Sequence, residues 1–369
     1  MGLPMNEAEA RVARVRVGGA RRIVVKIGSK TLASDASVYA RLAQVVAESR
    51  ASGREIVIVS SGAIALGVKK LGYRSRPKEM AKLQASAAAG QSILMRLYEE
   101  AFEVHGIPVA QVLLTHADLA DRTRDNNARA ALGALLEAGA VPVLNENDSV
   151  SVEEIKFGDN DQLASMVVPL IDAEVLVLLS DVAGLLDASG ERIPVVVNVV
   201  NDALPHVHAG TSGVGTGGMA SKVEAARRAT LAGADVVVAD ARAPEALGAL
   251  LRGDDVGTLF VRNPEPLGAR RHWIAFTLRP KGTLIVDDGA VRALRERGKS
   301  LLAVGVLGVR GLFAPSDAVV IVDVAGHEVA RGLARHGAQE LARLAGKRTE
   351  DDGIAVHRDD LVVWPNADA

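Results

Sequence analysis

The sequence contains no cysteine, which excludes disulfide bonds, thiol catalysis and thiolate metal sites. Its 43 Lys+Arg against 45 Asp+Glu leave a net charge of -2, so there is no whole-chain electrostatic case for binding nucleic acid or anionic membrane. No apolar run approaches the length of a membrane span, and residues 1–22 lack the apolar segment of a signal peptide. We therefore expect a cytoplasmic protein whose ligands bind at local sites.

What is present is an ordinary globular composition, with 49% apolar residues in a chain of 369. Between Ile23 and Asp240, short Val- and Ile-rich runs alternate with Ala-rich amphipathic stretches, as in βα units. This predicts the α/β class, with a mostly parallel sheet sandwiched by helices. The expected strands are Ile23–Lys26, Glu55–Ser60, Ile107–Leu113, Val141–Leu144, Val175–Ser180 and Asp235–Ala239. The expected helices lie near residues 38–52, 77–105, 124–138, 162–171 and 219–232.

Four domain segments follow from changes in composition along the chain. Residues 1–20 are predicted to be a frayed N-terminal extension, and residues 21–262 the α/β domain. Residues 263–275 contain prolines and arginines and are predicted to be a linker. Residues 276–369 alternate short strands with frequent glycine, which predicts a small β-rich domain.

Several predicted strands end in a polar residue: Lys26, Ser60, Asn145 and the pair Ser180 and Asp181. In open α/β sheets the ligand lies beyond the carboxyl ends of the strands, so these positions are candidates for one shared site. The small-residue turn at Ser60–Ala63 could receive a substrate carboxylate, although similar turns also serve only as helix caps.

The stretch Asn145–Asp161 carries two Asn/Asp clusters, NEND and GDND. Such clusters supply acceptors for an ammonium and amide donors for a carboxylate, as a small amino acid would require. A solvated acidic turn is the alternative, because Asn, Asp and Gly are common loop formers. Asp159 could also cap the next helix, with Gln162 completing a capping box.

A glycine-rich segment, Gly210–Lys222, runs directly into a predicted helix. Glycines allow backbone N–H groups to approach phosphate oxygens, and the helix N-terminus adds partial positive charge, so this is a candidate anion cradle. It matches neither the P-loop nor the Rossmann spacing, and a flexible loop with a surface lysine is the alternative.

Two lysines, Lys26 and Lys222, could clamp a transferring phosphoryl group from opposite sides, with Asp161 as a shared counter-ion. Lys26 could instead snorkel from its strand end. The histidines show no metal-ligand spacing, and no cofactor motif is present. Phosphoryl transfer is therefore the chemical class that the residues favour.

At this level of detail the chain resembles the glutamate 5-kinases, enzymes of the amino-acid-kinase fold in proline biosynthesis. The matching segments are VVKIGSKTL, IVIVSSGAIALG, QVLLTHADLADR, NENDSV, KFGDND, LLSDVAGLL and GVGTGGMASK. The tail resembles a PUA domain, through residues 298–323 and 356–363.

The resemblance implies ATP-dependent phosphorylation of the γ-carboxylate of L-glutamate, with Mg²⁺ carried on the nucleotide phosphates and no metal site on the protein. Catalytic roles would belong to Lys26, Lys222 and Asp161, and substrate binding to Ser61, Asp148 and Asn160. The predicted ATP contacts are Lys26, Ser180, Asp181, Thr216, Gly217, Gly218, Met219, Ala220, Ser221 and Lys222. Ala220 departs from the serine common in the family.

The same resemblance implies proline as a feedback inhibitor acting near Asn145–Asp161, a homo-oligomer (dimer or tetramer), and glutamate-5-semialdehyde dehydrogenase as a partner. PUA domains elsewhere bind RNA. Here the tail has almost equal numbers of basic and acidic residues and no basic stripe with aromatics, so RNA binding is not expected.

Overall fold

The computed structural model describes residues 7–35, 37–150, 160–207, 218–347 and 353–364. The chain divides into two compact units, one ending at Pro266 and the other beginning at Leu267. Within the described ranges, no helix has both the length and the apolarity needed to cross a bilayer.

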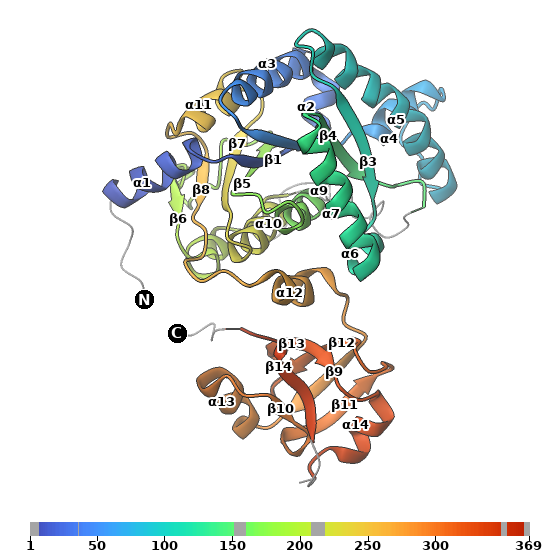
Figure 1. Ribbon diagram of the computed structural model, residues 1–369, viewed down its shortest axis with the longest axis vertical. Coiled ribbons are helices and arrows are strands. Elements are labelled where there is room, and N and C mark those ends of the chain that lie inside the picture. The colour runs from blue at the N-terminus through green and yellow to red at the C-terminus, as the bar shows by residue number, and fades with distance from the viewer. Residues whose placement is uncertain (1–6, 36, 151–159, 208–217, 348–352, 365–369) are drawn as a thin grey trace. The chain divides into compact units, whose positions relative to one another are not determined.

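The first unit is built on an eight-stranded sheet (Figure 1). Its strands are β1 Arg22–Ile27, β2 Glu55–Val59, β3 Val109–Leu114, β4 Val141–Glu146, β5 Val175–Ser180, β6 Val195–Val196, β7 Asp235–Asp240 and β8 Thr258–Phe260. They lie in the order β3-β4-β2-β1-β5-β7-β8-β6. Every neighbouring pair is parallel except β7 and β8. β2 lies on one side of β1 and β5 lies on the other, so the strand order reverses between β1 and β5. Ligands bind at such a point in open α/β sheets.

Both faces of this sheet are covered by helices, because side chains alternate between the faces along each strand. Ile23, Val25 and Ile27 of β1 pack in one apolar cluster, whereas Val24 packs in the other. The first cluster includes helices α1 Glu7–Gly18, α2 Ser29–Ser34, α3 Ser37–Ala51, α4 Ala63–Lys70, α5 Met80–Glu103 and α11 Ala246–Arg252. The second includes α6 His116–Ala120, α7 Arg122–Glu137, α9 Asn160–Leu170, η1 Val199–Ala203 and α10 Met219–Leu231.

The predicted α/β class and the mostly parallel sheet between helices are confirmed. Each predicted strand has a counterpart within about two residues of its expected ends. The sequence did not indicate β6, the antiparallel strand β8 or the helix α11 between β7 and β8, since these elements are short.

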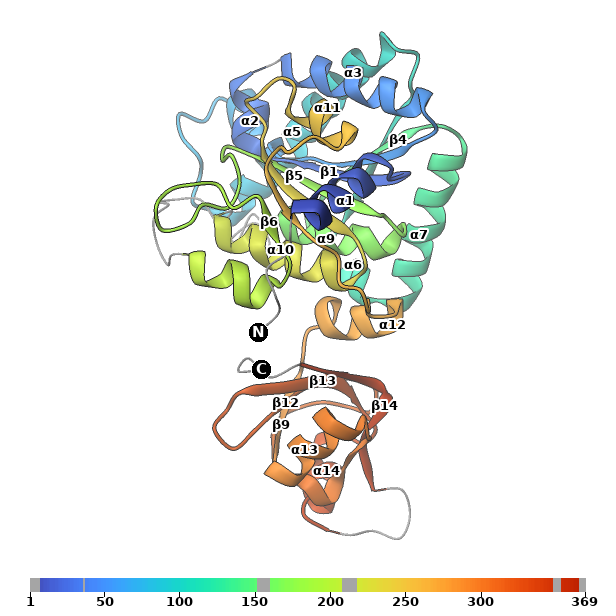
Figure 2. The same cartoon turned by 90° about the vertical axis from the view of Figure 1, so that its left-hand side faces the viewer.

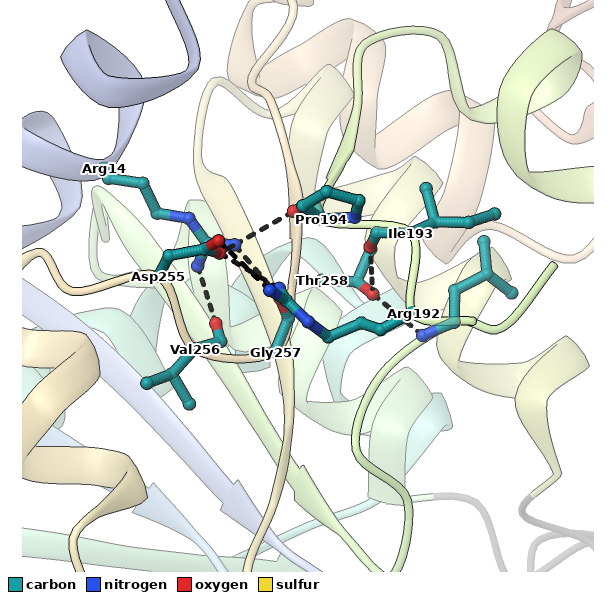
Figure 3. A network of polar contacts seen from close by, with 9 residues as sticks. Arg14, Arg192, Ile193, Pro194, Asp255, Val256, Gly257 and Thr258 are labelled. Carbon is teal, nitrogen blue, oxygen red and sulfur yellow. Dashed lines mark hydrogen bonds and ion pairs between the residues drawn. The ribbon is translucent and has the colours of Figure 1, made fainter. Parts of the chain in front are cut away.

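The expected frayed N-terminal extension is wrong for residues 7–18, which form α1. The anchor is Arg14, whose side chain is buried and donates hydrogen bonds to the backbone of three residues (Figure 3). Its guanidinium reaches the carbonyls of Val256 at 2.6 Å, Pro194 at 2.9 Å and Gly257 at 3.0 Å, and the Asp255 carboxylate at 2.9 Å. Burial lowers the pKa of Arg14, although the Asp255 charge opposes this shift. The helix is thus bonded to the segments that directly precede β6 and β8.

We expect Arg14→Ala to lower the free energy of unfolding by about 2–3 kcal/mol, because three backbone carbonyls, of which that of Gly257 is buried, lose a charged donor. Urea unfolding of the full chain measures this change. Arg11→Ala, on the exposed side of the same helix, is the matched control. Equal stability of the two variants would show that α1 is not anchored through Arg14.

The second unit contains a six-stranded sheet of order β10-β14-β13-β12-β9-β11 (Figure 1). Figure 2 shows β9, β12, β13 and β14 of this sheet from another side. Its elements are β9 Gly282–Val286, α13 Asp288–Arg297, β10 Leu301–Leu302, β11 Val306–Gly311, β12 Ala318–Val322, β13 Glu328–Ala334, α14 Ala338–Leu344 and β14 Ile354–Val363. A separate apolar cluster fills it, so the predicted β-rich tail domain has its own core. Residues 263–275, predicted to be a linker, contain the short helix α12 Ala269–His272 and the start of η3 Trp273–Thr277.

Candidate active site

The site is built at the carboxyl ends of four adjacent parallel strands, β4, β2, β1 and β5. Pairing places Lys26 opposite Val59 on one side and opposite Leu178 on the other. Val59 in turn lies opposite Leu144, so Ser60 and Asn145 follow at the same level of the sheet. The predicted convergence of polar strand ends is therefore observed for these four strands.

An ion-paired cluster of three residues lies at this edge. The Asp161 carboxylate, at the start of α9, is fully buried and lies between Lys26 of β1 and Lys222 of α10. One carboxylate oxygen is 2.5 Å from Lys26 Nζ, and the other is 3.2 Å from Lys222 Nζ. Ser221 Oγ donates a further hydrogen bond of 2.9 Å to that second oxygen. One carboxylate thus fixes the spacing of two ammonium groups.

The surroundings of Asp161 favour its ionised form. Burial on its own raises the pKa of Asp161, but the charges of Lys26 and Lys222 and the hydrogen bonds from Lys26 and Ser221 outweigh it. The net result is a pKa below the ordinary value for aspartate. Two cations with one anion leave one excess positive charge, which suits a negatively charged ligand.

Beside this cluster lies a group of amide and hydroxyl side chains from β4, the turn after β2 and α9. Asn160 Nδ2 donates to the Ser60 carbonyl at 2.7 Å, to Ser61 Oγ at 2.8 Å and to Asn145 Oδ1 at 3.0 Å. Asp148 follows β4 in a turn and is half-buried. Of the three predicted substrate ligands, Ser61 and Asn160 are thus in direct contact.

On the other side of β1, Ser180 ends β5 and hydrogen-bonds through Oγ to Asp181 at 3.2 Å. The Asp181 carboxylate is 3.1 Å from the exposed Nζ of Lys30. The Lys30 hydrogen bond is the main cause that lowers the pKa of Asp181, against the effect of burial. Lys30 belongs to the motif VVKIGSKTL, but the sequence alone does not indicate that this cation lies at the rim of the site.

The glycine-rich segment is described only from Gly218 onward. Thr216 and Gly217, predicted ATP contacts, lie outside the described residues, as does Asp159, the predicted cap of α9. Gly218 precedes α10, Met219 is half-buried and Ala220 is exposed in its first turn. Lys222 is buried one turn further along the helix.

Comparisons with known proteins match both parts of the chain to known families. Residues 21–240 match the model of the amino acid kinase family, and residues 282–351 match the PUA domain model. The glutamate 5-kinase of Myxococcus xanthus is 49% identical over 370 residues, covering 95% of this chain and 98% of the relative. That of Chromobacterium violaceum is 44% identical over 361 residues, covering 92% and 97%.

A solved structure, the N-acetylglutamate synthase of Neisseria gonorrhoeae complexed with coenzyme A and L-arginine, superimposes with a TM-score of 0.50. It is 17% identical, covering 69% of this chain and 65% of that chain, so it supports the fold alone.

The sheet, the paired lysines and the matched model together define the class: the chain is an ATP-using kinase of the amino acid kinase family. The sequence identity to these relatives, over nearly the whole chain, narrows the assignment from the class to one enzyme family. The chain belongs to the glutamate 5-kinases, with a C-terminal PUA domain. The predicted resemblance is confirmed.

Proposed function

We propose that this enzyme transfers the γ-phosphoryl group of ATP to the γ-carboxylate of L-glutamate, giving glutamyl 5-phosphate and ADP. The observation that carries the proposal is the buried Lys26–Asp161–Lys222 cluster beside the Ser61–Asn160 group. The named activity of the full-length relatives supports glutamate as the acceptor.

The residues divide the chemistry between them. Lys26 and Lys222 would neutralise the oxygens of the moving phosphoryl group, and Asp161 would hold both ammonium groups in place. The glutamate carboxylate is already ionised at neutral pH, so it serves as nucleophile without a general base. Ser61, Asp148 and Asn160 would then orient glutamate so that this carboxylate faces the γ-phosphorus.

ATP would bind on the β5 and α10 side, through Lys26, Ser180, Asp181 and residues 216–222. Among the described residues, no group of three His, Cys, Asp or Glu side chains could hold a metal ion. We propose that Mg²⁺ enters on the nucleotide phosphates, where it would supply charge neutralisation in addition to the lysines.

Several finer predictions rest on the same family membership: a role in proline biosynthesis, inhibition by proline near Asn145–Asp161, assembly into a homo-oligomer, association with glutamate-5-semialdehyde dehydrogenase, and a cytoplasmic location. The domain limits 21–262 and 276–369 also belong to the proposal. Comparing full-length and tail-deleted protein, with and without millimolar proline, addresses inhibition and the role of the PUA domain together.

A substrate screen tests the proposed reaction. The release of ADP is measured in a coupled assay, with glutamate, N-acetylglutamate, aspartate or UMP as the acceptor. We expect turnover with glutamate and not with N-acetylglutamate, because the carboxylate and amide oxygens of the NEND and GDND clusters suit a free ammonium group better than an acetylated amine. Turnover with glutamate no higher than the background would refute the proposal.

A further inference from the structure

A buried tyrosine contacts the turn Ser60–Gly62, which follows β2. Tyr98, in α5, places its hydroxyl oxygen 2.9 Å from Ser60 Oγ, and both residues are fully buried. Burial is the main cause that raises the pKa of Tyr98, so the hydroxyl stays protonated at neutral pH. Neither the comparisons nor the proposed reaction gives this hydroxyl a role.

The position of Tyr98 is fixed by its surroundings. Its ring packs edge-on against Tyr39 at a centroid distance of 5.1 Å and lies 6.3 Å from the ring of Phe102. Helices α4 and α5 approach so closely that a Cβ at Gly90 would overlap the backbone carbonyl of Ala63. The helix that begins directly after the turn is thus pressed against the helix that carries Tyr98.

Ser60 connects this tyrosine to the candidate substrate contacts. Its N–H donates to the Leu144 carbonyl at 2.8 Å, and its own carbonyl accepts the Asn160 amide at 2.7 Å. The next residues are Ser61, whose hydroxyl accepts from the same amide, and Gly62, whose φ of 99° requires a residue without Cβ. The Tyr98 hydroxyl therefore holds the side chain of the residue whose backbone positions Ser61 and Asn160.

We infer that Tyr98 is a positioning residue that holds the Ser60–Gly62 turn in the shape that binds the amino acid substrate. This inference rests on the proposed function, since it assumes that Ser61 and Asn160 contact glutamate. Tyr98 bonds to the turn and takes no part in the ion pairs of Asp161 with Lys26 and Lys222, so we expect phosphoryl transfer from a saturated enzyme to depend little on it. Binding of glutamate, rather than of ATP, should therefore respond.

The test is Tyr98→Phe, with Tyr39→Phe as the matched control. Among the described residues, the buried Tyr39 hydroxyl has no hydrogen-bond partner, so its removal deletes the same atom from the same apolar cluster without breaking a bond. Loss of one buried hydrogen bond should raise KM for glutamate by about fivefold in Tyr98→Phe. The kcat and KM for ATP should stay within about twofold of wild type. Tyr39→Phe should match wild type in all three.

Ser60 variants separate positioning from general loss of stability. Ser60→Ala should reproduce the Tyr98→Phe kinetics. The double variant should be no worse than either single one. Glutamate affinity measured by calorimetry provides the same comparison without turnover. An inactive wild type would refute the proposed function. An active wild type with equal KM values for Tyr98→Phe and Tyr39→Phe, or a parallel rise in KM for ATP, would overturn the role of Tyr98.

Discussion

Lys222→Ala should lower kcat with glutamate by about 10²–10³-fold while the protein still folds. In the proposed reaction, Lys222 is one of two cations at the place where negative charge develops during phosphoryl transfer. Its loss leaves Asp161 still paired with Lys26, so no carboxylate is left buried without a counter-ion. The effect should therefore appear in turnover far more than in stability.

Steady-state kinetics and urea unfolding of the same preparation measure both quantities. Lys82→Ala provides the control, because Lys82 lies on the exposed surface of α5 and pairs with nearby Glu79. Retention of more than about a tenth of the wild-type rate would exclude a transition-state role for Lys222.

Asp161→Asn should lower both the turnover and the stability of the enzyme. The substitution leaves two buried ammonium groups facing each other without their shared carboxylate, so we expect a loss of about 3–5 kcal/mol of stability together with most of the activity. Asp254→Asn, which removes a carboxylate from an exposed pair with Arg252, should change stability little. Unchanged unfolding of Asp161→Asn would show that the lysines do not need this counter-ion.

The pH dependence of that stability difference follows from the direction of the shift. The folded protein lowers the pKa of Asp161, so the stabilisation is fully present above the ordinary aspartate pKa of about 3.9. It is lost only as the pH falls through the lowered folded value. The gap between wild type and Asp161→Asn should be constant from about pH 7 to pH 5 and should shrink only below about pH 4. A gap that narrows already near pH 6 would contradict the lowered pKa.

The residues of the phosphoryl site could be predicted because each lies at the end of a strand or in the first turn of a helix. Lys26 follows an apolar run, and Asp161 and Lys222 begin amphipathic helices, so parallel-sheet topology alone brings them to one edge. Their pairing was predicted as a shared counter-ion, and the distances of 2.5 and 3.2 Å agree with it.

What the sequence did not reveal depends on contacts between distant segments. Arg14 bonds to residues up to 243 positions away, and a charged residue in a polar helix normally indicates a solvated surface. The Tyr98 hydroxyl meets Ser60 across 38 residues, and nothing in the local pattern of α5 distinguishes Tyr98 from any other core aromatic. Lys30 lies within a motif that the sequence itself indicates. Only its distance of 3.1 Å from Asp181 places it at the rim of the site.

The anchoring of α1 has a practical meaning for how the catalytic unit is delimited. The family model begins at residue 21, so a chain trimmed to the matched region would start after both Arg14 and Arg16. Arg16 forms a two-pronged pair with the buried Asp235 at 2.6 and 2.7 Å, and trimming would leave that carboxylate inside the protein without its guanidinium. It would also remove the helix that packs against α11, which carries the buried Leu250 and Leu251. A catalytic fragment should therefore begin before Glu7. The folded unit starts further toward the N-terminus than the region that the family model matches.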